Sequence, residues 1–379
     1  MKAGKAFATT ICAILIGAAS STYVLGQIAA APERPLTASS EDSQLPLPVA
    51  AVDPSQGAGG DDAGFSQPCC GPRWTVSAEC IIFDRIGTVP YTLVSKAPVP
   101  PLSGPSTEVL NATDLHQGFA GGPRLGLIHH GDDDGDLEIS YFQIDGWNSY
   151  RSIGPTPNNL LIMTAPGNFF QFQDDVLHLN EQIMAWGYTS RLYNAEVNMR
   201  WNPWRRVTVL AGFRWAELRE ELQGLLTPPG TSGAGPFWDT QTKNNLYGVQ
   251  IGANARLLER GRFSIDGVLK AGVYDNHAEE ATSVRMERIQ FADSDATDHF
   301  AFLGEIGLQC KYQVTPRLSF TAGYEAMWLE GVALAPGQIA QTYCYSDGIP
   351  QNTYVQAMGL NCNSGVFYHG ATVGLTYSF

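Results

Sequence analysis

The chain contains 379 residues, of which 16% are charged and 11% aromatic, and its formal net charge is −14. An acidic chain lacks the basic face that phosphate binding requires, so these numbers argue against a nucleic-acid partner. The 40 glycines and the many aromatic residues favour an all-β fold over a helical one.

The N-terminus has the features of a secretory signal peptide. Lys2 and Lys5 precede an apolar run that leads into small residues near Gly26. This order is typical of a cleaved signal, and the hydroxyl residues within the run make it too polar for a membrane anchor. We expect residues 1–26 to direct export, and residues 27–72, rich in Pro, Ala and Ser, to form a disordered periplasmic tether.

Ten segments from Trp74 onward alternate apolar and polar residues. Side chains on a strand point to alternate faces, so each segment predicts a strand with one apolar face. Most reach the roughly 9–11 residues that a tilted strand needs to cross a bilayer. The clear segments are "RWTVSAECIIF", "LYNAEVNMRW", "LYGVQIGANARLL", "HFAFLGEIGLQCKY", "RLSFTAGYEAMW" and "YHGATVGLTYSF", and weaker ones lie near 119–128, 135–147, 205–219 and 262–275.

The links between these segments alternate in length. Short periplasmic turns and long extracellular loops are the known asymmetry of outer-membrane barrels. We therefore predict a closed antiparallel transmembrane β-barrel of about ten strands over residues 73–379, or of twelve strands if "NNLLIMTAPGNFFQFQ" forms a hairpin. The short links lie at 129–135, 202–204, 259–261 and 314–316, and the long links at 86–118, 148–190, 220–244, 276–297 and 331–365.

The C-terminal strand ends on Phe379. An even strand count places both termini in the periplasm, and a final strand that ends in an aromatic residue looks like the assembly signal of bacterial outer-membrane proteins. We expect the chain to lie in the outer membrane of a Gram-negative-type bacterium. Its expected partners are outer-membrane lipid and, through Phe379, the barrel-assembly machinery.

Several strings in this region also resemble a known family. "LAGFRWAELREEL", "TKNNLYGVQIGA", "KAGVYDNHA", "FLGEIGL" and "AGYEAMWLEGVALAPGQ" are similar to segments of the β-barrel porin-like outer-membrane proteins of planctomycete-type bacteria. The resemblance covers residues 74–379 and leaves the tether outside. It implies an outer-membrane barrel of porin-like type, and it brings no catalytic residues with it.

The predicted inward faces carry charges of both signs. About eight strands make a barrel that side chains fill, whereas about 16–18 strands leave an aqueous channel, so ten strands predict a narrow or plugged lumen. The inward charges either pair with one another as a structural network or line a selective path. They are Glu79, Glu138, Glu196, Arg200, Arg214, Arg256, Asp266, Lys270, Glu305, Lys311 and Glu325.

Two functions follow from such a lumen. The first is porin-like passive diffusion of small polar solutes or ions. The alternative is a structural or adhesive surface barrel with a plugged lumen that acts through its extracellular loops. The largest loop, 331–365, begins with "GVALAPGQ", which we expect to hold the loop mouth. No cofactor is expected, and the oligomeric state stays open.

An outer-membrane hydrolase is a third and weaker interpretation. Its best candidate group is Asp275 and His277 at one strand end with Asp298 and His299 at the start of the next. A carboxylate–histidine pair can activate water. However, the sequence contains neither a "GxSxG" nor an "HExxH" motif, so we expect no enzymatic activity.

Six cysteines remain after the expected signal peptide. Cys344 and Cys362 are the disulfide candidate, because both lie in one long polar segment of an exported chain. The pairing of Cys69, Cys70, Cys80 and Cys310 stays open. No metal site is expected, because the adjacent pair at 69–70 lacks a partner pair and "DDDGDLE" does not match a calcium loop.

Overall fold

The computed structural model describes residues 71–98, 107–131, 135–154, 159–163, 183–227, 236–285, 290–339, 341–346, 353–357 and 359–379. The expected signal peptide and the expected tether up to Cys70 lie outside these residues. Within them, no helix has the length and hydropathy that crossing a membrane requires.

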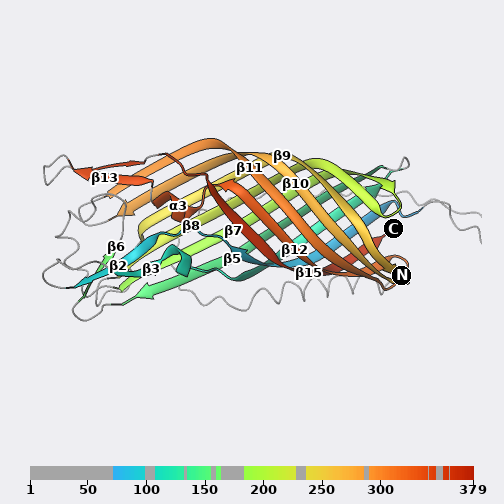
Figure 1. Cartoon of the computed structure of the whole chain (residues 1–379), viewed down its shortest axis with the longest axis horizontal. Helices are drawn as coiled ribbons and strands as arrows, with labels where there is room; N and C mark the ends of the chain where they lie inside the picture. Colours follow the sequence, from blue (N-terminus) through green and yellow to red (C-terminus); the bar gives the residue numbers. More distant parts are fainter. Residues whose placement is uncertain are drawn as a thin grey trace, which may run out of the picture. The chain divides into compact units, whose positions relative to one another are not determined.

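Ten strands form one closed antiparallel barrel, which confirms the predicted fold class (Figure 1). Each strand pairs with its neighbours in sequence order among the barrel strands, and β1 pairs with β15 to close the cylinder. The strands are β1 (Trp74–Ile86), β4 (Phe119–His130), β5 (Gly135–Ile153), β7 (Ile183–Trp204), β8 (Val207–Thr227), β9 (Pro236–Arg260), β10 (Phe263–Arg285), β11 (Gln290–Gln313), β12 (Leu318–Val332) and β15 (Ser364–Ser378).

The last residue takes part in this closure. The backbone N–H of Trp74 donates to the carbonyl oxygen of Phe379 at 2.9 Å, and the N–H of Phe379 donates to the carbonyl of Trp74 at 2.8 Å. Because both sheet edges are paired in this way, the barrel exposes no open edge. The end that holds these residues and the short turns is called the periplasmic end below.

The outer wall carries the apolar residues that the alternation predicts. A closed barrel in a bilayer turns this face toward lipid, where no water is available to solvate polar groups. Large exposed apolar side chains therefore occur on every barrel strand, among them Val76, Leu125, Ile139, Val197, Phe213, Ile251, Leu269, Ile306, Phe320 and Val373.

Two of the expected long loops are mostly strand. In place of the links 220–244 and 276–297, β8 and β9 pair as far as Leu225 opposite Pro236, and β10 and β11 pair as far as Arg285 opposite Gln290. The outer ends of these strands lie beyond the band of exposed apolar residues on the outer wall, so we expect neither of their faces to contact lipid. The apolar alternation is lost there, although the backbone pairing continues.

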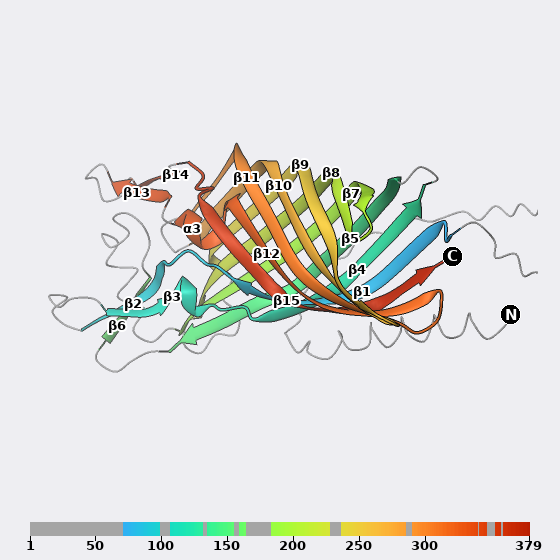
Figure 2. The same ribbon diagram turned by 45° about the vertical axis from the view of Figure 1, so that its right-hand side comes forward.

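Two short sheets and two short helices lie at the extracellular end in the described part of the chain (Figure 2). A three-stranded sheet has the order β3-β2-β6, and β6 is the described part of the segment expected as an additional hairpin. The closed barrel has ten strands and not twelve. These elements are β2 (Thr92–Pro98), β3 (Thr107–Asn111), the short helix η1 (Ala112–Asp114), β6 (Asn159–Met163), α3 (Ala335–Ile339), β13 (Thr342–Ser346) and β14 (Thr353–Ala357).

Candidate functional site in the barrel interior

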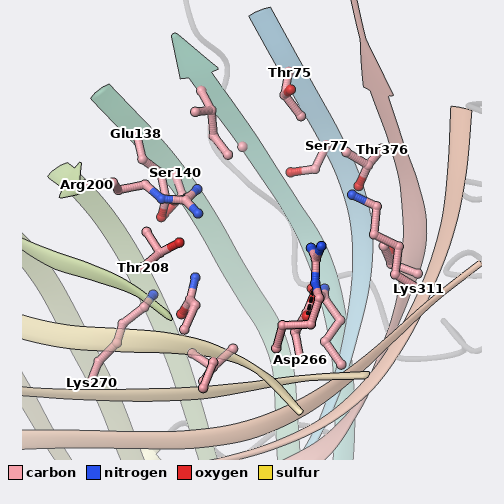
Figure 3. Close-up of a pocket in the computed structure, with 18 of the residues that line it drawn as sticks. Thr75, Ser77, Glu138, Ser140, Arg200, Thr208, Asp266, Lys270, Lys311 and Thr376 are labelled. Carbon is pink, nitrogen blue, oxygen red and sulfur yellow. Dashed lines mark hydrogen bonds and ion pairs between the residues drawn. The ribbon is translucent and has the colours of Figure 1, made fainter. Parts of the chain in front are cut away.

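A cavity of about 690 Å³ occupies the periplasmic part of the barrel interior (Figure 3). All ten barrel strands contribute inward side chains to its wall. Many of these residues are small or carry hydroxyl groups, for example Ser77 on β1, Ser140 on β5 and Thr376 on β15. Small inward residues leave volume that larger side chains would fill, so this part of the lumen stays open to solvent.

A buried group of four charged residues lies at the inner end of this cavity. The guanidinium of Arg214, which is fully buried, lies 3.1 Å from Glu305 and 3.6 Å from Glu196. The ammonium of Lys270 lies 3.0 Å from Glu196 and 3.5 Å from Glu305. Two cations thus alternate with two carboxylates, and each charge has two partners of opposite sign. Such pairing is what a buried charge requires.

A second ionic group extends around the wall at the same depth. Both terminal nitrogens of Arg124 donate to the carboxylate of Glu325, at 2.6 and 2.7 Å, and one lies 3.7 Å from Glu79. Glu79 also accepts hydrogen bonds from Gln309 and Thr321. A bidentate arginine–carboxylate pair holds both side chains in one geometry. The ionic layer therefore has a defined structure and does not leave loose charges in the lumen.

The predicted inward charges all lie in this region. Ten of the eleven line the cavity itself, and Arg214 adjoins it through Glu196 and Glu305. Nearer the periplasmic end, Arg200 pairs with Glu138 at 2.7 Å, and Arg256 pairs with Asp266 at 3.1 Å.

Arg124 is the functional residue that sequence reasoning missed. It lies on β4, whose glycines weaken the alternation, but the outward Leu125 and Leu127 on either side of an inward Gly126 carry the signal that places Arg124 inward. Lys311 differs from Arg200, Arg256 and Lys270, because it makes no ion pair or hydrogen bond with the residues that the structure describes.

An apolar layer fills the lumen on the extracellular side of the ionic layer. Its inward side chains are at most 3% exposed, apart from Ala120 at 8%. The indole of Trp147 spans part of this layer and donates a hydrogen bond to the carbonyl of Phe83 at 3.1 Å. Side chains along an aqueous channel keep exposed surface, so no water path passes beside these. The largest are Phe83, Phe142, Ile144, Trp147, Leu192, Leu246, Tyr274, Met327 and Tyr368.

Residues 332–339 form an inserted segment above this layer, and every residue in it is buried. The amide of Asn244 holds it by accepting from the N–H of Ala333 at 2.7 Å and donating to the carbonyl of Ala333 at 2.8 Å. Asn244 faces inward from β9, so the segment lies inside the barrel. "GVALAPGQ" was expected at the loop mouth, and its inward position is a correction to that expectation.

A glycine allows the chain to turn inward at the start of this segment. Gly331 has a positive φ of 82°, and a Cβ there would lie 2.3 Å from the carbonyl oxygen of Phe300. Both the backbone conformation and the close approach to β11 therefore exclude a side chain. This requirement cannot be recognised from hydrophobic periodicity.

The carboxylate of Glu220 collects four donors at the inserted segment. It accepts from Arg85, from the hydroxyl of Tyr188 at 2.6 Å, from Ser190 at 3.3 Å, and from the backbone N–H of Ala335 at 3.1 Å. Three of these donors come from the barrel wall and the fourth from the helix α3. Glu220 thus ties the inserted segment to the wall through one buried group.

The candidate hydrolytic group does not converge. Nδ1 of His277 lies 2.7 Å from the carboxylate of Asp298, and both side chains are exposed on the outer wall. His299 lies opposite Asn276, whose side chain faces inward, so it occupies the other face of the sheet. The alternation of side chains along β11 separates Asp298 from His299 and explains this outcome.

The expected disulfide between Cys344 and Cys362 is also corrected. Cys362 is a free, buried cysteine that packs with Ala278, Ala333 and Leu360. The side chain of Cys344 lies outside the described residues. Burial in an apolar cluster raises the preference of Cys362 for the neutral thiol. Cys80 and Cys310 are free as well.

Comparisons with known proteins agree with this architecture. The family model described as Putative beta barrel porin-7 (BBP7) matches residues 183–379, which is more than half of the chain. No curated protein matches the chain.

Among solved structures, the chain is similar to the outer membrane protease OmpT from Escherichia coli, at 8% identity and a TM-score of 0.45, over 81% of this chain and 96% of that one. It is also similar to the toluene transporter TodX from P. putida, at 9% identity and a TM-score of 0.30, over 83% and 91%. A third similar structure is the translocator domain of the autotransporter NalP from Neisseria meningitidis, at 8% identity and a TM-score of 0.35, over 81% and 88%. Likenesses at these identities and scores say nothing about what the chain binds or transports.

Proposed function

The chain belongs to the beta barrel porin-7 family, and we propose that it is an outer-membrane barrel with a plugged lumen that presents a rigid extracellular cap. The observation that carries this proposal is the apolar layer. Most of its side chains come from the barrel strands, Val332 and Leu334 of the inserted segment join them, and all are buried across the lumen. Ten strands enclose little more space than the eight that side chains are known to fill.

The extracellular cap has an apolar core of its own, which supports a role at the cell surface. Leu93, Leu110 and Leu161 from the sheet β3-β2-β6 pack on inward aromatic residues of the barrel, among them Trp186 and Trp238. The inserted segment joins the same core through Ala335 and Ile339. A cap with a continuous core keeps a fixed shape, as a binding or structural surface requires.

The experiment is single-channel recording in planar bilayers with the full chain lacking only the expected signal peptide. We expect no discrete current steps, together with the heat-modifiable gel shift that marks a folded barrel. A second variant in which residues 333–339 are replaced by a Gly-Ser linker is expected to stay silent, because the large side chains of the apolar layer, among them Phe83, Trp147 and Tyr368, come from the barrel strands. Discrete steps from the unaltered chain would contradict the proposal.

Passive diffusion of small polar solutes or ions is the second candidate function. The charge-lined cavity of about 690 Å³ at the periplasmic end favours it, since this cavity admits solutes of that class. The same recordings distinguish the two functions. Current steps whose reversal potential shifts in a salt gradient would support diffusion and would report the charge preference of the lumen.

A further inference from the structure

The charges that line the periplasmic cavity do not balance. Its wall carries seven basic and six acidic residues, in a chain whose formal net charge is −14. All six acidic residues already pair with bases inside the barrel. The bases without an ion-pair partner among the described residues are Arg205, Arg206 and Lys311. Among the described residues, the lining therefore carries one more positive than negative charge, although the chain as a whole is acidic.

Lys311 occupies the most enclosed position of the three. It is half-buried on β11, and its charged neighbours are Asp266, Arg256 and Arg200. Asp266 is already engaged by Arg256, and Arg200 by Glu138, so the carboxylates around Lys311 are taken. An ammonium group in a cavity that other cations also line favours the approach of an anion. Lys311 therefore carries a positive charge that no carboxylate among the described residues neutralises.

Hydroxyl groups complete the surroundings of this position. Figure 3 shows the side chain of Lys311 extending toward Thr376 and Ser77 on the adjoining cavity wall. Thr75 and Thr321 line the same cavity. Hydroxyl donors and cationic groups together match the oxygens of phosphate, which accept several charge-assisted hydrogen bonds at once.

We propose that Lys311, with the hydroxyl groups of Ser77 and Thr376, forms a binding site for a phosphate-type oxyanion that enters the barrel from the periplasmic side. The ligand is either a free phosphate compound or the headgroup of an anionic phospholipid from the inner leaflet. Both share the same anionic oxygens. The site depends on the cavity and its charges, and it does not require the lumen to conduct.

The test uses the full folded chain and three variants, each checked for folding by its heat-modifiable gel shift. Lys311→Gln removes the uncommitted charge, and Lys311→Arg keeps it. Lys243→Gln is the matched control, because Lys243 undergoes the same charge change on an exposed extracellular site beside Glu279. Inorganic phosphate is titrated by calorimetry into protein in lipid-free detergent. In a second arm, phosphatidylglycerol retained by the protein is measured by native mass spectrometry.

We expect phosphate binding that weakens about tenfold or more in Lys311→Gln, since a charge-assisted hydrogen bond contributes on that scale. Binding should persist in Lys311→Arg and be unchanged in Lys243→Gln. If only phosphatidylglycerol is retained, with the same dependence on Lys311, the headgroup is the source of the anion. The proposal is overturned if neither probe binds, or if Lys311→Gln and Lys243→Gln behave alike.

Discussion

The periplasmic and extracellular parts of the barrel interior share one wall of ten strands but differ in the size of their inward residues. On the periplasmic side, Ser77, Gly126 and Thr376 leave a cavity of about 690 Å³. On the extracellular side, Phe83 and Trp147 on the same or adjoining strands fill the cross-section. Strand number sets the diameter of a barrel. At a fixed diameter, the volume of the inward side chains decides whether a given level of the lumen is open.

The largest expected effect concerns the extracellular part. Trp147→Ala removes a fully buried indole and its hydrogen bond to Phe83, and it leaves a cavity in the apolar layer. We expect the free energy of unfolding to fall by about 4 kcal/mol, as measured by urea denaturation in micelles. Trp204→Ala is the control, because that side chain is exposed at the periplasmic end. Equal losses from both variants would show that the apolar layer is not packed.

The ionic layer should be almost as sensitive. Arg214→Ala leaves Glu196 and Glu305 sharing Lys270, so each of the two buried carboxylates loses one of its two cationic partners. We expect a loss of about 3 kcal/mol in the same denaturation assay. The matched variant Arg256→Ala removes a partly exposed pair near the mouth and should lose less than about 1 kcal/mol. If the two variants lose equal stability, the layer does not act as a buried network.

The inserted segment offers a smaller and more local test. Asn244→Ala removes both hydrogen bonds to Ala333 and leaves that backbone amide and carbonyl without their partner. We expect faster hydrogen exchange within residues 332–339 by a factor of roughly 10, which corresponds to the loss of one to two buried hydrogen bonds. Exchange in the ionic layer should be unchanged. Faster exchange throughout the barrel would mean that the segment supports the wall as well.

The smallest effect lies outside the lumen. The carboxylate of Asp298 accepts a hydrogen bond from His277 and raises the pKa of this exposed histidine. A raised pKa favours the protonated form, so the pair stabilises the fold below the ordinary histidine pKa, and this contribution is lost as pH rises through the higher value. Histidine-selective NMR should give a lower pKa for His277 in Asp298→Asn. An unchanged pKa would contradict the contact.

Much of the fold could be predicted because lipid imposes a regular pattern. The barrel strands carry apolar residues at alternate positions where they meet the bilayer, as in Val373, Leu375 and Tyr377, although glycines weaken this pattern on β4. Above the bilayer this constraint ends, and the continuation of β8 to β11 in place of two loops was missed for that reason. The inserted segment was missed because a loop buried inside a barrel needs a matching shape and no periodic pattern of apolar residues. Gly331, where the chain turns inward, is the main feature of the sequence that marks it.

The sequence by itself determined the strands, their two faces and the end at which the short turns lie, because each of these depends on neighbours along the chain. Only the tertiary structure decided which charges meet: Arg124 pairs with Glu325 and Arg214 with Glu305, although each pair is far apart in sequence. Barrel closure and the stagger of the strands bring these residues to one level. The same geometry decides whether the lumen is open, because inward side chains from all ten strands together fill each cross-section.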